Sequence, residues 1–194
     1  MAKKKVKVSK ERQVNTYHEL WRTSYWTLNQ AEEKYDGSYF QIMASLIFTA
    51  FSFEAYLNHL GGDIFHCWDD LERLSPQSKL NVLSEELNIK KDYSKRPFQT
   101  IKELYKFRND IAHGKTIILK TNEEIQIIDS KIDAYISEPL EAEWQKYCTL
   151  DNAKKARKDT EAIMEIFHKE SGVFDEDLFF PKPWISRGEL INEQ

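Results

Sequence analysis

The sequence predicts an all-α fold, a helical bundle that carries a small β-hairpin insertion. Long segments repeat apolar residues at helical spacing, and helix-capping residues separate those segments. The 194 residues include only six glycines and five prolines, which favours long regular elements. Hydrophobic residues make up 41% of the chain, which is enough for one domain with a buried core. This composition excludes an intrinsically disordered chain.

The first two helices are predicted over residues 11–35 and 39–60, at the start of a helical domain that spans residues 11–171. Asp36-Gly37-Ser38 combines a helix stop with a new N-cap. The second helix is apolar on nearly every side, so we expect it at the centre of the core. Gly61-Gly62 is predicted to end it.

Three more helices are predicted after a short irregular stretch. Ser75-Pro76 supplies an N-cap followed by a proline at the first helical position. Pro97 opens the next helix, which we expect to end at Gly114 in the left-handed conformation. Glu138-Pro139 is predicted to begin a last long helix that reaches Ser171.

A hairpin is predicted immediately after the helix that ends at Gly114. Residues 116–120 and 125–128 are rich in isoleucine, and the turn-forming sequence between them favours pairing. At the two ends, residues 1–10 are expected to form a flexible basic arm. Residues 172–194 are expected to form an aromatic and acidic tail that packs on the body.

The net charge of −4 is unevenly distributed. The first ten residues hold five lysines and no acid, so the rest carries 23 basic and 32 acidic residues, a net charge of −9. An acidic body argues against broad, nonspecific binding of nucleic acid. The longest apolar stretch, Ile42–Phe51, is too short to span a bilayer, which needs about 20 residues. Two cysteines suit a reducing compartment, so we expect a cytoplasmic protein without membrane contact.

The segment with most chemical content is Phe107-Arg108-Asn109-Asp110-Ile111-Ala112-His113-Gly114. At about 100° per residue, Arg108 falls on the apolar stripe of its helix, where an unpaired charge is costly. Between Gly37 and Gly62 the sequence has one formally charged residue, Glu54. Each of these charges needs a partner, so the sequence predicts an ion pair between Glu54 and Arg108.

The same segment has the residue types that metal-free RNA cleavage requires. A base must remove the 2′-hydroxyl proton and an acid must protonate the leaving 5′-oxygen, and histidine can do either near neutral pH. Arginine can stabilise the charge that builds up on the phosphate. One chain supplies one such histidine, so a twofold dimer would be needed to supply two. The structural alternative is that Arg108 only pairs with Glu54 and His113 only caps the helix.

Arg108, Asn109 and His113, late in an amphipathic helix and behind an apolar helix with one glutamate, resemble the motif of the HEPN superfamily. Its signature is an arginine, commonly followed by a polar residue, and a histidine four to six positions after the arginine. The segment 53–58 around Glu54 is similar to the family's earlier core helix. The resemblance covers about residues 10–115.

The resemblance implies a homodimer that acts as a metal-independent endoribonuclease and leaves 2′,3′-cyclic phosphate and 5′-hydroxyl ends. It assigns catalysis to Arg108, His113 and Asn109, with Glu54 positioning the arginine. Family members are frequent in toxin–antitoxin and antiviral defence systems, which implies RNA and a partner or antitoxin protein as binding partners. Toxins paired with nucleotidyltransferase antitoxins often have a tyrosine two residues after the histidine, where this chain has Lys115.

Other signals in the sequence are weaker. Six basic residues near the motif and on the last helix are candidates for contacts with the RNA backbone: Lys106, Lys115, Lys154, Lys155, Arg157 and Lys158. The residues around His66-Cys67 fit no zinc pattern, and we expect neither a metal nor a cofactor. The alternatives to a ribonuclease are a non-catalytic HEPN module that binds RNA, nucleotide or a protein, and a purely structural helical dimer.

Overall fold

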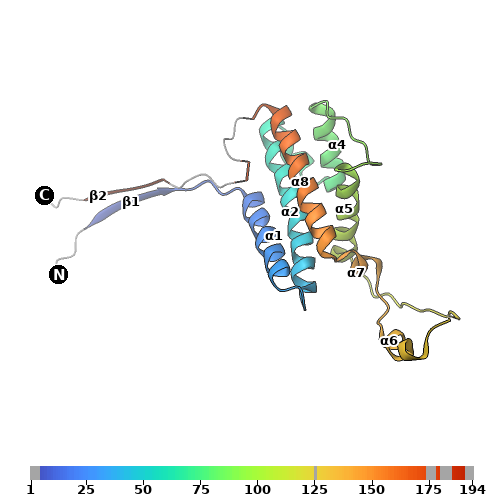
Figure 1. Ribbon diagram of the computed structural model, residues 1–194. Coiled ribbons are helices and arrows are strands. Elements are labelled where there is room, and N and C mark those ends of the chain that lie inside the picture. Colours follow the sequence, from blue (N-terminus) through green and yellow to red (C-terminus); the bar gives the residue numbers. More distant parts are fainter. Residues whose placement is uncertain (1–4, 125, 174–177, 180–184, 191–194) are drawn as a thin grey trace.

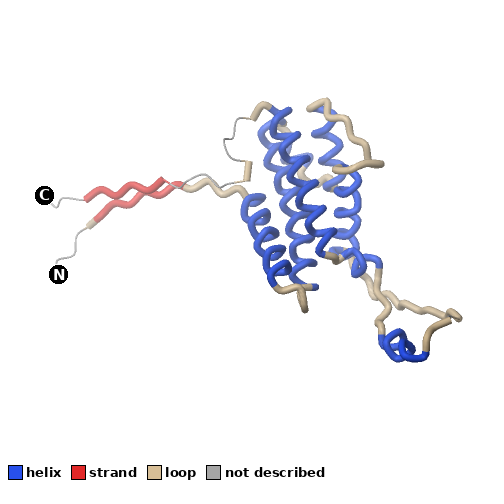
Figure 2. The backbone as a smooth tube through the Cα atoms, in the orientation of Figure 1, coloured by secondary structure: helices blue, strands red, loops and turns tan. Residues whose placement is uncertain are grey.

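The computed structural model describes residues 5–124, 126–173, 178–179 and 185–190, and it is mostly helical. Upright helices form a bundle, and two extensions leave it (Figure 1). A two-stranded ribbon extends from one side, and a long insertion that carries a short helix extends from the opposite end (Figure 2). The predicted helical bundle is therefore confirmed, and its β-structure lies in a different place from the one predicted.

The helices have the following bounds: α1 Thr16–Glu33, α2 Tyr39–Ile64, α3 Trp68–Leu71, α4 Pro76–Glu86, α5 Phe98–Ala112, α6 Ile132–Ser137, α7 Glu143–Tyr147 and α8 Leu150–Ser171. A 3₁₀ turn, Asp129–Lys131, precedes α6. The strands are β1, Val6–Glu11, and β2, Ile185–Leu190.

Helix α2 is the centre of the bundle, as its apolar sequence predicts. It contacts α1, α3, α4, α5 and α8, and its side chains Leu46, Phe53 and Leu57 are completely buried. Among the described residues, α2 is the helix whose length and hydropathy would also permit it to cross a membrane. Its burial among the other helices is that of a core helix.

Small polar residues let α1 lie close against α2. The Ser52 hydroxyl donates to the carbonyl of Tyr17 at 2.9 Å, and the Ser45 hydroxyl donates to the carbonyl of Ser24 at 2.9 Å. From the same helix, the Tyr56 hydroxyl donates to the carbonyl of Met164 on α8 at 3.1 Å. These buried hydroxyl groups are thus satisfied across helix interfaces, which fixes the register of three helices.

The predicted helix starts and stops are partly confirmed. Ser75 caps α4, because its hydroxyl accepts from the backbone N–H of Ser78 at 3.1 Å. Gly37 follows α1 with a φ of +80°. The last helix does not begin at Glu138-Pro139: α7 comes first, and α8 starts anew where the Thr149 hydroxyl accepts from the N–H of Asn152.

Helix α2 continues through Gly61 and Gly62 to Ile64, so the predicted stop at this pair is wrong. The reason for glycine at 61 is tertiary contact. The indole ring of Trp68 packs so closely on Gly61 that a Cβ would lie 2.2 Å from ring atom Cε2. Gly61 therefore permits the close return of α3 onto the end of α2.

The hairpin predicted over residues 116–128 does not form in the described part of that stretch. The described residues of this stretch form no strand, and Ile117 and Ile118 are exposed. The sheet is instead built from β1 and β2, which run antiparallel with Val6 opposite Leu190 and Glu11 opposite Ile185. The local isoleucine pattern suggested a pairing of neighbours, whereas the actual pairing joins the two ends of the chain.

The ends of the chain thus differ from their predicted form. Residues 6–11, expected within or beside a flexible arm, are a strand of the ribbon, and Lys3 and Lys4 lie outside the described residues. The tail packs on the body at Phe179, whose ring stacks on that of Trp21 with centroids 5.3 Å apart. The other aromatic residues expected to pack there, Phe174, Phe180 and Trp184, lie outside the described residues.

Candidate functional site

The Arg–His motif lies on the last turns of α5, at the end of the bundle where the insertion leaves it (Figure 1). Residues Ile101, Leu104 and Tyr105 anchor the preceding turns in the core. Arg108 continues this inward-facing stripe and is partly buried, with 21% of its side chain exposed. The helix therefore holds the guanidinium at the edge of the core and carries the rest of the motif to the surface.

The predicted pair between Glu54 and Arg108 is present. Arg108 Nη2 donates to Glu54 Oε2 at 3.1 Å, which links α5 to α2. The pair is not bidentate, because the other carboxylate oxygen has a second cation. Lys79 Nζ on α4 donates to Glu54 Oε1 at 3.4 Å, and only 3% of the Lys79 side chain is exposed. One carboxylate thus balances two cations, and the cluster keeps a net positive charge.

The remaining contacts of Arg108 hold the guanidinium but leave donors unused. Its Cζ lies 5.4 Å from the centroid of the Phe51 ring, within the range of a cation–π contact. Its Nη1 donates to the side-chain oxygen of Asn109 at 3.1 Å. Its Nε is buried and has no hydrogen-bond partner among the described residues. Asn109, expected to orient a phosphate or the histidine, contacts the arginine in this structure.

His113 is the C-cap of α5, and its side chain is exposed. Its backbone N–H donates to the carbonyl of Asn109 at 3.0 Å, and no hydrogen bond joins its ring to a described residue. The prediction of a left-handed glycine at 114 is wrong, because the described glycines with positive φ are Gly37 and Gly172. Gly114 instead passes close to the helix end, where a Cβ would lie 3.2 Å from the carbonyl oxygen of Asp110.

Two of the basic residues expected to contact RNA have carboxylate partners in the structure. Lys154 pairs with Glu32 on α1, and Lys155 pairs with Glu103 on α5 at 3.2 Å. The remaining three lysines of the set are exposed: Lys106, Lys115 and Lys158.

Arg157 is a structural residue rather than part of an exposed basic face. Its guanidinium lies 3.8 Å from the centroid of the Trp21 ring and donates to the Trp21 carbonyl at 3.0 Å and to the Ser24 hydroxyl. Burial lowers the pKa of Arg157 to about 10. It lies at the interface of α1 and α8, and its contact with RNA stays a prediction.

A second ionic cluster was not predicted. Asp159 on α8 is buried and accepts from Arg96 Nε at 2.7 Å and from Arg96 Nη2 at 2.8 Å. The Thr100 hydroxyl donates to the same carboxylate. Sequence reasoning also missed Lys79, although it directly precedes the buried Leu80 of the α4 stripe. Asp159 and Lys79 lie in helices that contain other charged or polar residues. Their burial therefore cannot be recognised from the spacing of apolar residues in the sequence.

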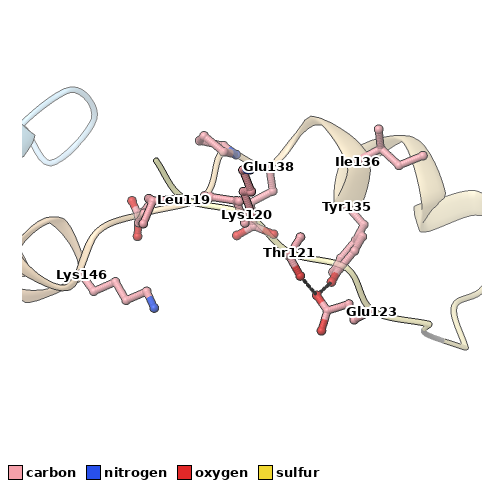
Figure 3. A pocket seen from close by; sticks show the side chains of 11 residues that line it. Leu119, Lys120, Thr121, Glu123, Tyr135, Ile136, Glu138 and Lys146 are labelled. Atoms are coloured by element: carbon pink, nitrogen blue, oxygen red, sulfur yellow. Dashed lines mark hydrogen bonds between the residues drawn. The ribbon is translucent and has the colours of Figure 1, made fainter. Parts of the chain in front are cut away.

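A cavity of about 650 Å³ lies in the insertion (Figure 3). One of its three carboxylates, that of Glu123, accepts from the hydroxyl groups of Tyr135 at 2.7 Å and Thr121 at 3.2 Å. It contains no motif residue. Among the described residues no cluster of three or more His, Cys, Asp or Glu side chains could hold a metal ion, and both Cys67 and Cys148 are free thiols.

A smaller cavity of about 320 Å³ lies between α5, α7 and α8, beside the motif. Aromatic side chains of α5 and α7 line it together with charged residues of the same two helices, and α8 contributes Asn152. Comparisons with models of protein families, with characterised proteins and with solved structures find no match to this chain. The function must therefore be inferred from the residues themselves.

Proposed function

We propose that this chain is a metal-independent endoribonuclease of the HEPN type that acts as a homodimer in the cytoplasm. The observation that carries the proposal is the arrangement on α5. Arg108 is held on one side by Glu54 and keeps unused donors, while His113 is exposed on the same helix end without a hydrogen-bond partner. The guanidinium of Arg108 can bind a phosphate, and the imidazole of His113 can exchange a proton with the substrate. Both groups lie on α5, an arrangement that suits acid–base chemistry on a phosphodiester.

In the proposed reaction, one imidazole removes the proton from a 2′-hydroxyl, whose oxygen then attacks the adjacent phosphorus. The bond from phosphorus to the 5′-oxygen breaks, and a protonated imidazole gives that oxygen a proton. The products are a 2′,3′-cyclic phosphate and a 5′-hydroxyl. Arg108 stabilises the added negative charge on the phosphate oxygens. Two copies of His113, one from each protomer, supply the base and the acid.

The side chains around Arg108 have distinct roles in this proposal. Glu54 fixes the guanidinium from behind, since it lies on the core helix. Asn109 lies on the exposed side and accepts from Nη1, so it orients the guanidinium where the phosphate would approach. We infer a setting in toxin–antitoxin or antiviral defence systems from the motif, in which the activity is controlled by a partner.

The test is incubation of the purified protein with mixed cellular RNA in EDTA, followed by analysis of the fragment ends. We expect cleavage by the wild type, fragments with cyclic phosphate ends, and loss of cleavage in His113→Ala. The matched control is His66→Ala, which removes another exposed histidine from outside the motif. Cleavage by His113→Ala at the wild-type rate, or a requirement for Mg²⁺, would contradict the proposal.

The oligomeric state tests the composite site separately. A protein that is monomeric at micromolar concentration and still cleaves RNA would contradict the shared site. Light scattering after size-exclusion chromatography measures this directly.

A second candidate is a non-catalytic module that binds a partner protein, and the insertion favours it. Ile118 and Ile136 are 80% and 75% exposed, and the insertion begins directly after His113. Several further apolar residues of the same insertion are exposed, including Ile117, Ile128 and Leu140, and such an accumulation is typical of a protein contact. A folded dimer that cleaves no RNA in any of these assays would favour this candidate.

A further inference from the structure

We propose that the cavity between α5, α7 and α8 is a binding subsite for a guanine base of single-stranded RNA. The inference rests on the proposed function for its biological role, and its binding test is independent of cleavage. The cavity has a volume of about 320 Å³, at the lower end of the range of about 300–1,000 Å³ typical of ligand sites. The argument uses six of its lining residues: Lys106, Phe107, Asp110, Glu143, Trp144 and Tyr147.

The walls of the cavity suit a flat aromatic ligand. Phe107 is buried and its ring lies against that of Tyr147, with centroids 5.2 Å apart. Trp144 and Tyr147 are partly buried, so parts of both aromatic side chains remain accessible. Unpaired RNA bases are commonly recognised by stacking on aromatic side chains, at about 1–3 kcal/mol per base. These three rings come from two helices that the bundle already fixes.

The charged groups at the cavity indicate which base edge would be recognised. Glu143 is paired with Lys146 at 3.0 Å. The carboxylate of Asp110 makes no hydrogen bond or ion pair with a described residue. An ionised carboxylate offers acceptors only, and its charge repels phosphate, so it selects a base edge with N–H donors.

Guanine is the base that fits two charged groups of α5 at this cavity, Lys106 and Asp110, since the third, Glu103, pairs with Lys155. Its N1–H and N2 amino group form two adjacent donors, which one carboxylate such as that of Asp110 can accept. Its O6 and N7 atoms are acceptors, and a lysine such as Lys106 can donate to them. Lys106 and Asp110 are four residues apart and therefore share one side of α5.

The cavity is also placed to act together with the motif. Residues 106, 110 and 113 follow one side of α5, and Asp110 precedes His113 by about 4.5 Å along the helix axis. A base held at Asp110 would leave its sugar and phosphate at the end of the helix, beside His113. The subsite would thereby select where the proposed cleavage occurs.

The binding test uses nucleosides, because they carry no phosphate that Arg108 could attract. Guanosine, adenosine, cytidine and uridine are titrated into the full-length protein and followed by ¹H–¹⁵N NMR. We expect guanosine to bind about tenfold or more tightly than the others, with the largest shifts at the Trp144 indole N–H and the Phe107 amide. Inosine, which lacks the 2-amino group, should bind more weakly than guanosine.

The matched variants are Asp110→Asn and Glu165→Gln, the second of which removes an exposed carboxylate of α8 outside the cavity. Asp110→Asn should lose the preference for guanosine, and Glu165→Gln should keep it. Equal binding of all nucleosides, or shifts that avoid Trp144 and Phe107, would overturn the subsite.

Fragment sequencing then separates this inference from the proposed function. Cleavage next to guanine by the wild type, and cleavage without that preference by Asp110→Asn, would support both. Guanosine binding without any RNA cleavage would support the subsite and count against the ribonuclease. Cleavage with no guanine preference and no guanosine binding would overturn the subsite alone.

Discussion

Two carboxylates on the inner side of the bundle, Asp159 on α8 and Glu54 on α2, have different surroundings. Asp159 accepts two hydrogen bonds from Arg96 and one from Thr100, so both of its oxygens are fully engaged. Glu54 gives one oxygen to Arg108 and the other to Lys79, at longer distances of 3.1 Å and 3.4 Å. In the first cluster one carboxylate balances one arginine and accepts three hydrogen bonds. In the second, one carboxylate balances two cations, so a net positive charge remains.

The difference shows which cluster is built for structure. In the Asp159 cluster the arginine is the outer member, with 52% of its side chain exposed, and it covers a carboxylate that the bundle buries. In the Glu54 cluster Lys79 is more buried than the carboxylate and Arg108 is as exposed as it is, and the Nε of Arg108 has no partner among the described residues. A saturated pair stabilises the fold, while an unsaturated guanidinium at the edge of the core can still receive an anion.

The largest effect is expected from Arg108→Ala. It should lower RNA cleavage about 10²–10³-fold, since it removes the group that stabilises the transition-state charge. The protein should remain folded and lose only about 1–2 kcal/mol of unfolding free energy, because Lys79 still pairs with Glu54. Cleavage rates and urea denaturation measure the two effects. Arg73→Ala, which removes an exposed arginine, is the control. If Arg108→Ala unfolds, the role of Arg108 is to stabilise the fold and the proposed catalytic role is contradicted.

Asp159→Ala should have the opposite profile. It removes the acceptor of the buried Thr100 hydroxyl and the partner of Arg96, so we expect a loss of about 2–3 kcal/mol in unfolding free energy. The half-exposed Arg96 contributes little of this, since water solvates it. Cleavage by the folded fraction should be unchanged. Glu165→Ala on the same helix should have no measurable effect on stability, and a loss of cleavage in folded Asp159→Ala would remove the contrast between the clusters.

These two clusters also show how far sequence reasoning reaches. The pair of Glu54 with Arg108 could be predicted, because each was a single charge on an apolar helix face and needed a partner. Lys79 and the Asp159 cluster could not. Asp159 lies on a helix rich in charges, 63 residues from its partner Arg96, and nothing local distinguishes it from its exposed neighbours.

The β-structure was missed for a related reason. Residues 116–128 have a local strand pattern, but no strand forms in their described part, since strand stability depends on what the strand packs against. The pairing of Val6 with Leu190 joins residues at the two ends of the chain. No periodicity within a window of sequence predicts such a contact.

Lys79→Met should make the Glu54 cluster resemble the Asp159 cluster. The apolar side chain fits a buried position, and Glu54 Oε1 becomes free for a second hydrogen bond from Arg108. We expect a stability change within about 1 kcal/mol. We also expect a higher KM for RNA with a smaller change in kcat, since the guanidinium is held more by the protein. Lys79→Arg should keep the wild-type KM, and a raised KM in both variants, or in neither, would count against this role of Lys79.

The smallest effect is expected from Tyr105→Phe. The Tyr105 hydroxyl is buried beside the Glu54 cluster without a hydrogen-bond partner among the described residues, so its removal should be neutral or stabilise the fold by up to about 1 kcal/mol. Burial, and then the nearby Glu54, raises the pKa of Tyr105 well above 10, while Arg108 lowers it.

The pH dependence of Tyr105→Phe follows from the direction of that shift. Because the pKa is higher in the folded state, the neutral phenol supports folding fully below pH 10, and this contribution is lost as the pH rises toward the folded value. Above pH 10 the wild type should therefore lose stability more steeply than Tyr105→Phe, by up to about 1.4 kcal/mol per pH unit. Urea denaturation at pH 8 and pH 11 measures the difference. Equal slopes for the two proteins would contradict a raised pKa of Tyr105 in the folded state, and with it the burial of this hydroxyl beside Glu54.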